Sequence, residues 1–346
     1  MRAWWVQKFI ASWRPAIVNL TQIACPLQNT KVSTCVIHGH RGARGLAPEN
    51  TLAGFACACG IGVDGIELDV LISADERVVI HHDPRLNTEL CRDSSGEWLE
   101  GTTPLIRELT GEQLKTFDVG AIRPGSSQQS RFASRQSVPG ETIPLLSDLA
   151  RWWQSLHPRR PLLNIELKSD PRHPDQSPEP PDYARIVVNE LKKWNLAGEV
   201  WLQAFDWRVL QEIQRLADDV CTGYLSSERE HDATVRDDSE SPWLAGFDPT
   251  HFGASLPKAV KAAGGRFWGP AFADLSKDRV LEAQALGLGV HTWTLNEDED
   301  FRGALRLGVN GITTDYPDRA QAVFRAAGLA VAPPCTAAEP AAVAEG

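Results

Sequence analysis

The stretch VIHGHRGARGLAPENTLAGFACACGIGVDGIELDV (Val36–Val70) decides the fold, because a strand, a helix and a second strand follow one another within it. Short runs rich in β-branched and apolar residues, Cys35–His38 and Gly65–Val70, predict the two strands. Between them, Thr51–Cys59 has the apolar spacing of a helix. Strand–helix–strand units of this kind are typical of parallel sheets in α/β proteins.

The rest of the chain repeats this unit. Six further strands are predicted at Leu162–Leu167, Val200–Phe205, Val220–Leu225, Arg266–Trp268, Gly289–Leu295 and Gly311–Thr314. Helical patterns alternate with them at Leu146–Leu156, Tyr183–Trp194, Trp207–Ala217, Ser255–Ala263, Asp278–Leu286, Glu297–Leu307 and Pro317–Ala327. This order predicts an α/β protein of the (β/α)₈ TIM-barrel type. A doubly wound open sheet is the alternative, although it usually has fewer strands, and no G-x-G-x-x-G motif follows the first strand to indicate a dinucleotide site.

The connection after the second strand is far longer than the ~2–6 residues of an ordinary βα loop. It predicts a small subdomain inserted at about residues 71–145, with a hairpin-like piece at Val78–His82. An insertion at this rim of a barrel usually forms part of the substrate site. A second irregular segment, Ser226–Ala245, is acidic and polar, and we interpret it as a surface loop without assigned chemistry.

The two ends of the chain differ from the barrel pattern. Residues 1–34 contain Trp, Phe, Lys and Arg without a sustained apolar run, which predicts an N-terminal extension that is helical or disordered. Residues 326–346 are mostly Ala, Pro, Val and Glu, and they predict a flexible tail. The barrel is therefore expected over residues 35–325.

Composition excludes several classes of protein. The 346 residues are 42% hydrophobic, which excludes a disordered or collagen-like chain. A net charge of −10 argues against a nucleic-acid partner, although one Arg and one Lys in a cleft are enough to bind a small phosphate ligand. The seven cysteines are widely spread and odd in number, so they do not form the disulfide framework of a small secreted domain.

Apolar runs of five or six residues are too short for a bilayer, which takes ~20, so no stable membrane insertion is expected. The lack of a clear apolar export segment favours a cytoplasmic protein. A periplasmic or secreted protein is the alternative if residues 1–34 form an atypical signal. The oligomeric state leaves no signature in the sequence.

Candidate site residues stand where the predicted strands end, and barrels have their active sites at that end. After the first strand, Arg41 offers a guanidinium fork for phosphate oxygens, and the glycines around it allow the backbone to approach a ligand closely. The helix that opens near Asn50 adds N–H groups that favour an anion. Together they predict a site for a phosphate group.

Carboxylates recur at these strand ends. Glu67 and Asp69 lie two residues apart and therefore on the same face of the second strand, and Glu166 with Lys168 repeats this spacing on the third. Carboxylates packed inside a barrel mouth need a cation or a proton to neutralise them. Three carboxylates without Cys or His form a hard-oxygen site, which predicts Mg²⁺ or Ca²⁺ rather than zinc. Taken alone, Glu166 and Lys168 are equally consistent with a buried ion pair.

Two histidines are placed to act on a phosphate. His40 follows the first strand, and one of His81 and His82 faces the same site, because neighbours on an extended segment point opposite ways. Such a pair suits general acid–base catalysis, in which one His removes a proton from the nucleophile and the other protonates the leaving alkoxide. We interpret His38 and His81 as idle or supporting residues.

Seven motifs together resemble those of the glycerophosphodiester phosphodiesterase family over about Val36–Arg319. They are HRGARGLAPENT (His40–Thr51), GVDGIELDV (Gly62–Val70), VVIHHDPRL (Val78–Leu86), NIELK (Asn164–Lys168), QAFDW (Gln203–Trp207), HTWTLN (His291–Asn296) and GVNGITTDYPD (Gly308–Asp318). The resemblance implies a (β/α)₈ barrel with a small subdomain inserted after the second strand. Ala204 stands where the family often has Ser, which puts only a secondary contact in doubt.

The resemblance also implies roles for individual residues. His40 and His82 correspond to the catalytic acid–base pair, His82 being chosen because the family's histidine directly precedes the Asp. The implied metal ligands are Glu67, Asp69 and Glu166, and the implied substrate contacts are Arg41 and Lys168 to the phosphate and Trp293 to the glycerol or alcohol. Further positions within the matching motifs are Glu49, Gln203, Phe205 and Asp315.

The implied reaction is metal-dependent hydrolysis of glycerophosphodiesters to sn-glycerol 3-phosphate and an alcohol, a reaction of glycerol and lipid metabolism. The nucleophile is either the neighbouring glycerol hydroxyl, through a cyclic phosphate, or water. Two alternatives stay open. One is phospholipase D-like hydrolysis of lysophospholipids at the same site, and the other is binding of a phosphodiester without catalysis.

Overall fold

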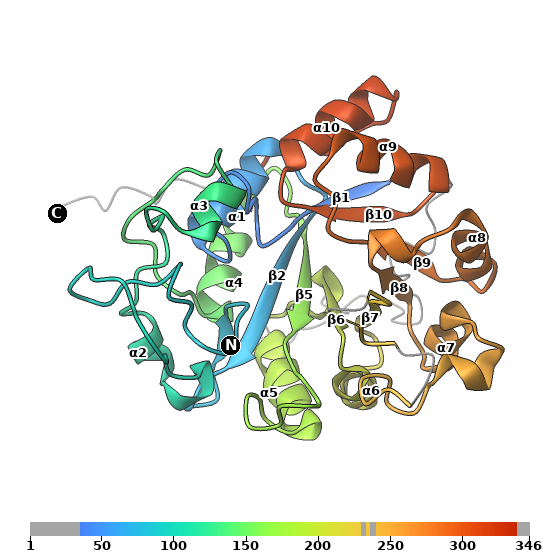
Figure 1. Ribbon diagram of the computed structural model, residues 1–346, viewed down its shortest axis with the longest axis horizontal. Helices are drawn as coiled ribbons and strands as arrows, with labels where there is room; N and C mark the ends of the chain where they lie inside the picture. The colour runs from blue at the N-terminus through green and yellow to red at the C-terminus, as the bar shows by residue number, and fades with distance from the viewer. Residues whose placement is uncertain (1–34, 230–232, 236–239, 338–346) are drawn as a thin grey trace, which may run out of the picture.

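Eight parallel strands close into a barrel in the computed structural model, which describes residues 35–229, 233–235 and 240–337 (Figure 1). The barrel strands are β1 (Val36–Gly39), β2 (Gly65–Ile72), β5 (Leu162–Leu167), β6 (Val200–Ala204), β7 (Cys221–Ser226), β8 (Phe267–Pro270), β9 (Gly289–Thr292) and β10 (Gly311–Thr314). β1 pairs with β10 on one side and with β2 on the other, which closes the sheet. The predicted (β/α)₈ barrel is confirmed, and the open-sheet alternative is wrong because the sheet has no gap between its first and last barrel strands.

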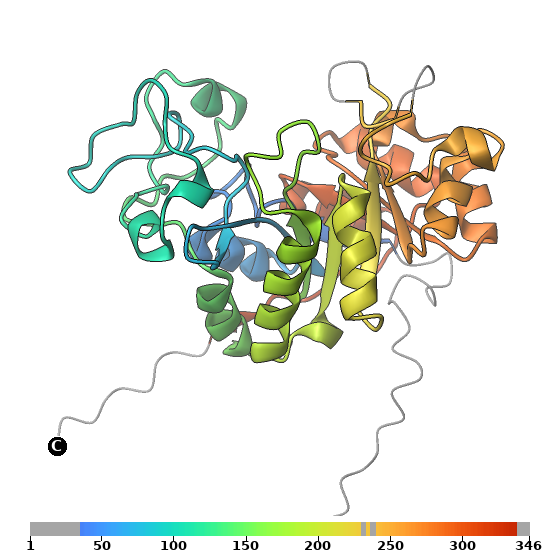
Figure 2. The same ribbon diagram turned by 90° about the horizontal axis from the view of Figure 1, so that it is seen from below.

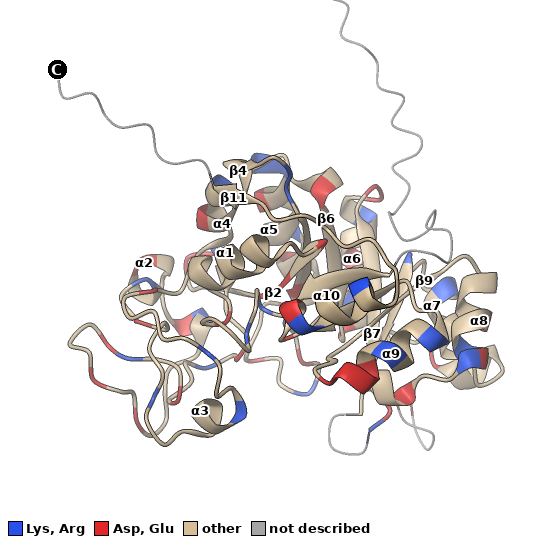
Figure 3. Cartoon of the chain, turned by 90° about the horizontal axis from the view of Figure 1, so that it is seen from above, with Lys and Arg blue, Asp and Glu red and all other residues tan. Residues whose placement is uncertain are grey.

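Eight helices follow the barrel strands and surround them. They are α1 (Leu52–Ile61), α4 (Leu146–Gln154), α5 (Pro180–Lys193), α6 (Trp207–Leu216), α7 (Leu256–Ala262), α8 (Lys277–Ala285), α9 (Asp298–Leu307) and α10 (Pro317–Ala326), with short 3₁₀ turns at η3 (Ala197–Glu199), η4 (Pro249–Phe252) and η5 (Phe272–Asp274). α9 begins with three acidic residues and has Arg306 in its last turn, charges that favour the helix dipole (Figure 3). No helix within the described ranges has the length and hydrophobicity needed to cross a bilayer.

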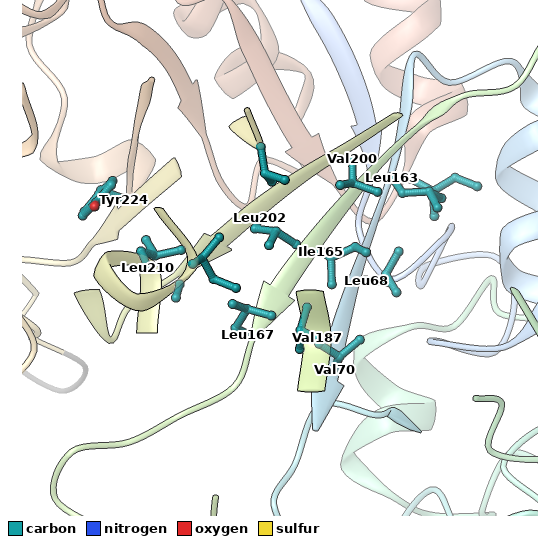
Figure 4. Packing of buried hydrophobic residues seen from close by; sticks show 14 of the residues in the cluster. Leu68, Val70, Leu163, Ile165, Leu167, Val187, Val200, Leu202, Leu210 and Tyr224 are labelled. Atoms are coloured by element: carbon teal, nitrogen blue, oxygen red, sulfur yellow. The ribbon is translucent and has the colours of Figure 1, made fainter. Parts of the chain in front are cut away.

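Side chains alternate between the two faces of each barrel strand. Leu68, Ile165 and Leu202 point outward, where they pack against residues such as Val187 of α5 and Leu210 of α6 (Figure 4). The intervening residues of the same strands point into the barrel, as period-two alternation requires. The strand register then aligns polar residues from neighbouring strands at one end, because Asp69 of β2 pairs with Glu166 of β5.

The insertion after β2 has a small core of its own. Its first element, β3 (Val78–Ile80), pairs antiparallel with the end of β2, and η2 (Ile106–Glu108), α2 (Gly111–Leu114) and α3 (Ser127–Arg131) follow. Their core is a separate cluster of buried residues, Leu71, Val79, Leu86, Leu90, Cys91, Ile106, Leu114, Ile143 and Leu145. Figure 2 shows the insertion at the same end of the barrel as the loop that follows β5. It therefore stands beside the mouth of the barrel.

The segment after α10 corrects the prediction of a flexible tail from residue 326. Within it, β11 (Thr336–Ala337) pairs antiparallel with β4 (Leu156–His157), the strand that follows α4. Cys335 is buried, and its backbone N–H donates to the carbonyl of Cys59 in α1 (3.0 Å). The tail prediction relied on Ala and Pro content and missed that a few apolar side chains suffice to hold the segment against α1. Residues 1–34 and 338–346 lie outside the described residues.

Candidate active site

A polar cavity of about 320 Å³ lies at the carboxyl ends of the barrel strands. It brings together most of the predicted site residues, namely His40, Arg41, Glu67, His82, Glu166, Lys168, Gln203, Phe205 and Trp293. Asp69, Glu49 and Asp315 lie directly behind this layer and contact residues that line the cavity. The predicted residues thus converge from β1, β2, β5, β6, β9 and β10 on one place, where barrel enzymes have their active sites.

Three buried carboxylates form the acidic triad of Glu67, Asp69 and Glu166. One oxygen from each lies within 4.8 Å of the others. Burial raises the pKa of Glu67 well above its usual range, and the charges of Asp69 and Glu166 add to this shift. Burial opposes the ionisation of Asp69 as well, but Arg41, His82 and Lys168 together hold its pKa far below the usual value. This hard-oxygen set with crowded negative charge fits a divalent cation such as Mg²⁺ or Ca²⁺.

Neighbouring groups orient the carboxylates of the triad. The backbone N–H of Arg41 donates to Glu67 Oε2 (2.9 Å), and Asn50 Nδ2 donates to Asp69 Oδ2 (2.9 Å). Lys168 Nζ lies 2.6 Å from Glu166 Oε1, so the two predicted roles of Lys168, ion pair and cavity cation, coexist. Each acid therefore has a partner that fixes its rotamer, as outer-shell groups do around metal ligands.

The expectation that the start of α1 binds an anion from the substrate is wrong. Thr51 Oγ1 caps the helix, and the N–H of Ala53 donates to Glu141 Oε2 of the insertion (3.3 Å). The dipole of α1 is therefore occupied by a carboxylate of the protein itself. Asn50 instead acts by holding Asp69.

The glycines of the first loop also differ from the expectation. Gly42 has φ +92°, and a Cβ there would lie 2.6 Å from the carbonyl carbon of Gly54 in α1. A Cβ on Gly39 would lie 2.0 Å from the carbonyl oxygen of Gly42. Their small size allows the loop to pack on itself and on α1, so that it aims Arg41 and His40, rather than allowing a ligand to approach the backbone.

His40 is held by a buried aspartate. Its Nδ1 lies 2.7 Å from Asp315 Oδ1, and since a carboxylate only accepts hydrogen bonds, Nδ1 carries the proton and Nε2 is left for the cavity. Asp315 also accepts from Arg44 (2.7 and 3.0 Å) and from Asn296 Nδ2 (2.7 Å). Burial lowers the pKa of His40 to about 4; the charge of Arg44 adds to this effect and Asp315 opposes it. The ring is therefore neutral at pH 7.

His82, which also lines the cavity, is held in the same way. Its Nδ1 lies 2.6 Å from Asp83 Oδ1, and Asn87 Nδ2 donates to the other oxygen of Asp83 (2.7 Å). His82 therefore presents Nε2 to the cavity, as His40 does. His81 is buried and does not line this cavity. This agrees with the expectation that neighbouring side chains on an extended segment point opposite ways.

Arg41 makes two ion pairs within the protein. Its Nη1 donates to Glu49 Oε1 (2.7 Å), and its Nε lies 3.1 Å from Asp69 Oδ2. Glu49 also accepts from Arg135 (3.3 Å); burial opposes its ionisation, but the nearby arginines lower its pKa to about 2. Two carboxylates thus hold the guanidinium group of Arg41 in place. The part of this group that faces the cavity is free to contact a phosphate.

Several cavity residues were not predicted. Arg44 and Asn296 lie in motifs that were recognised, and their roles beside Asp315 depend on a contact across the barrel. Arg131 comes from α3 of the insertion. Arg229 comes from the segment interpreted as a loop without chemistry, and its guanidinium lies over the ring of Trp293 (5.6 Å). The segment Ser226–Ala245 was interpreted as a surface loop without assigned chemistry, and no sequence signal marked Arg229 as a cavity residue.

A (β/α)₈ barrel with an acidic triad and two aspartate-held histidines around one polar cavity belongs to the barrel enzymes that act at the carboxyl ends of their strands. The sequence profile of the Glycerophosphoryl diester phosphodiesterase family matches residues 40–319, and the chain belongs to this family.

Known proteins resemble the chain over nearly their whole length. A solved structure from Silicibacter pomeroyi, named as a glycerophosphoryl diester phosphodiesterase, is 34% identical, with a TM-score of 0.78 over 88% of this chain and 97% of that one. The glycerophosphodiester phosphodiesterase of Bacillus altitudinis is 28% identical over 82% of this chain and 96% of its own length. An Oleispira antarctica phosphodiesterase, solved with the product sn-glycerol-3-phosphate, is 20% identical, with a TM-score of 0.59 over 84% of this chain and 97% of that one, and shows the same fold.

Proposed function

We propose that this protein hydrolyses glycerophosphodiesters to sn-glycerol 3-phosphate and an alcohol. The observation that carries the proposal is the juxtaposition, in one cavity, of the acidic triad with two histidines that are each oriented by an aspartate. Family membership supports the substrate class, as do the relatives named as glycerophosphodiester phosphodiesterases. The substrate is a small molecule, which the cavity volume of about 320 Å³ matches.

In this proposal Glu67, Asp69 and Glu166 hold a divalent cation, Mg²⁺ or Ca²⁺. The cation, when bound, offsets charge on the non-bridging phosphate oxygens. Arg41 and Lys168 add two positive charges at the same cavity wall, and both are fixed by carboxylates rather than free to follow the substrate. Fixed charges of this kind stabilise a transition state without reorganisation.

The two histidines move the protons. The Nδ1–H of each histidine donates a hydrogen bond to an aspartate, so that Nε2 of each ring faces the substrate. One histidine is neutral, and its Nε2 accepts the proton of the nucleophile, which is the adjacent glycerol hydroxyl or a water. The other enters the step as an imidazolium, and its Nε2–H donates a proton to the departing alkoxide. Asp315 and Asp83 stabilise the imidazolium forms.

The test is a ³¹P NMR assay of the purified protein against a panel of glycerophosphodiesters, with Mg²⁺, with Ca²⁺ and with EDTA. We expect a phosphomonoester to form with the cation and to disappear with EDTA. His40→Ala and His82→Ala are each expected to abolish turnover of glycerophosphocholine while the circular dichroism spectrum stays that of the parent. Full activity in either variant or in EDTA would contradict the mechanism, and binding of the diester without product would indicate a silent binding protein.

A second comparison assigns the acid and the base. An alcohol with a low pKa, such as p-nitrophenol, leaves without protonation, so the variant that lacks the general acid regains activity on glycerophospho-p-nitrophenol. The variant that lacks the general base stays inactive on both substrates. Equal rescue of both variants would contradict a division of roles between the two histidines.

A further inference from the structure

A second cavity opens beside the polar one, and we call it the apolar cavity. It has a volume of about 210 Å³ and shares part of its lining with the polar cavity, namely His82, Glu166, Lys168 and Phe205. Most of the surface of this cavity is apolar, and Leu71 of β2, Leu167 of β5, Pro84 and Trp243 form the apolar part of the rest of its wall. The polar part comes from Ser169, Asp170, Gln176 and Ser177. We propose that the apolar cavity binds a hydrocarbon group on one of the two alcohols of the diester, an inference that rests on the proposed function.

The indole of Trp243 is held in place from outside the cavity. The backbone N–H of Trp207, at the start of α6, donates to the carbonyl of Trp243 (2.8 Å). The guanidinium of Arg172, a residue that does not line the cavity, lies 5.0 Å from the centre of the indole ring. Arg172 is in turn fixed by two hydrogen bonds to Asp170 (2.9 and 2.7 Å). The wall is therefore preformed, which keeps the entropic cost of binding low.

Three of the four polar side chains that line only the apolar cavity, those of Ser169, Asp170 and Ser177, already have partners. Ser169 Oγ donates to Asp206 Oδ2 (2.7 Å), and Ser177 Oγ donates to Ser169 Oγ (3.4 Å). Asp170 forms an ion pair with Arg172. A charged or hydroxyl-rich group entering this cavity would lose its hydration with few new hydrogen bonds, whereas a hydrocarbon group gains from leaving water. The chemistry of the wall therefore selects hydrocarbon.

The position of His82 connects the two cavities to a single substrate. A phosphodiester carries two alcohol groups on its phosphorus. When the phosphorus lies between the acidic triad and the histidines, one of these groups passes His82, which lines both cavities, and enters the apolar cavity. The hydrocarbon group has two possible sources. It is either the head-group alcohol of an alkyl diester or the acyl chain on the glycerol of a lysophospholipid.

Two substrate series distinguish these sources, with divalent cation present throughout. The first contains sn-glycerol-3-phosphoalkanols from ethanol to hexanol, and the second contains glycerophosphocholine and its 1-butanoyl and 1-hexanoyl derivatives. Each buried methylene is expected to raise kcat/KM about fourfold, from ~0.8 kcal/mol per CH₂. The rise occurs in the series whose chain enters the apolar cavity.

Two variants of the wall and one control complete the test. Trp243→Ala removes the wall, and Gln176→Trp fills the cavity from its edge; both are expected to flatten the chain-length series and to leave the shortest substrate unaffected. Trp152→Ala is the matched control, because Trp152 is half-buried and lines a different cavity with Lys115 and Glu141, so the series keeps its slope.

The outcomes separate this inference from the proposed function. Hydrolysis of glycerophosphocholine with a flat response in both series overturns the inference alone. A slope that persists in both wall variants also overturns it. If no diester is hydrolysed by the parent protein with any cation, the proposed function fails and the inference fails with it.

Discussion

Two levels of the barrel interior each hold a pair of histidines, and one of these pairs lines the polar cavity. At the floor, the rings of His38 and His291 lie 4.3 Å apart and both contact Trp201. At the mouth, His40 and His82 face the polar cavity. β1 contributes to both levels, since His38 lies on it and His40 follows two residues later.

Burial does not separate His40 from the floor pair, although His82 is partly exposed. It lowers the pKa of His291 to about 3 and that of His38 well below the usual value, much as it lowers the pKa of His40 to about 4. What differs is the partner of Nδ1. At the mouth each Nδ1 donates to an aspartate, whereas at the floor Nδ1 of His38 and of His291 has no hydrogen-bond partner among the described residues. A carboxylate behind the ring and a cavity in front of it define the functional pair.

Replacement of the buried aspartate tests this distinction most strongly. Asp315→Asn keeps the shape of the side chain but removes the charge that fixes the tautomer of His40 and stabilises its imidazolium form. We expect kcat on glycerophosphocholine to fall by ~10²–10⁴, with KM changed less than threefold, as for an aspartate behind a catalytic histidine. Steady-state kinetics measures both quantities.

Arg44→Gln is a companion variant that separates the two contacts of Asp315, although Arg44 itself lines the cavity and its charge lowers the pKa of His40. It removes the ion pair that Asp315 makes with Arg44 and leaves the hydrogen bond to His40 in place. If loss of stability rather than loss of orientation were the cause, Arg44→Gln would lower kcat as much as Asp315→Asn does.

The equivalent change at His82 is expected to be milder. The side chain of Asp83 is 36% exposed, whereas that of Asp315 is fully buried, so water can replace part of what Asp83 contributes. Asp83→Asn should lower kcat by ~10–100-fold, the usual cost of losing a supporting hydrogen bond at a site. An effect as large as that of Asp315→Asn would show that exposure does not set the strength of the orienting aspartate.

The floor pair is expected to affect stability rather than activity. In the unfolded chain a histidine takes up a proton below pH ~6.5, but in the folded protein His291 does so only near pH 3, because burial opposes the charge. The unfolded state thus binds more protons below pH 6.5, and the contribution of His291 to stability is complete above that pH and is lost as the pH falls. From pH 6.5 to 5 the loss amounts to about 2 kcal/mol, at ~1.4 kcal/mol per pH unit.

Urea unfolding at pH 7 and pH 5 measures this loss. His291→Gln removes the titrating group, so its free energy of unfolding should fall less between the two pH values than that of the parent protein, by about 2 kcal/mol. His251→Gln, at an exposed position in η4, is the control for replacing a histidine outside the barrel interior. Identical pH dependence in the parent and in His291→Gln would show that the floor histidine is not held neutral by burial.

The difference between local and long-range contacts also decides how much of the molecule could be predicted from the sequence. Strand periodicity placed Glu67 and Asp69 on one face and predicted that only one of His81 and His82 faces the site, because both are consequences of local geometry. The choice of His82 came from the family motif, in which the histidine directly precedes the Asp. The carboxylate that covers the start of α1, Glu141, lies 88 residues from Ala53 and carries no local signal. Trp243 likewise enters the apolar cavity from a loop whose composition indicates only a surface position.

A pair of tryptophan variants extends the comparison to smaller effects. Trp201 of β6 lies at the floor, and its Nε1 has no hydrogen-bond partner among the described residues, whereas Trp293 at the mouth donates to the carbonyl of Gly269 (2.9 Å). Trp201→Phe loses packing but also removes an unpaired buried donor, so the free energy of unfolding should change by no more than about 1 kcal/mol and kcat/KM by less than twofold. Trp293→Phe breaks a hydrogen bond at the cavity wall and should lower kcat/KM by about threefold to tenfold. Equal losses of kcat/KM in the two variants would mean that packing at the floor affects catalysis at the mouth. The barrel interior would then not divide into a structural level and a functional level.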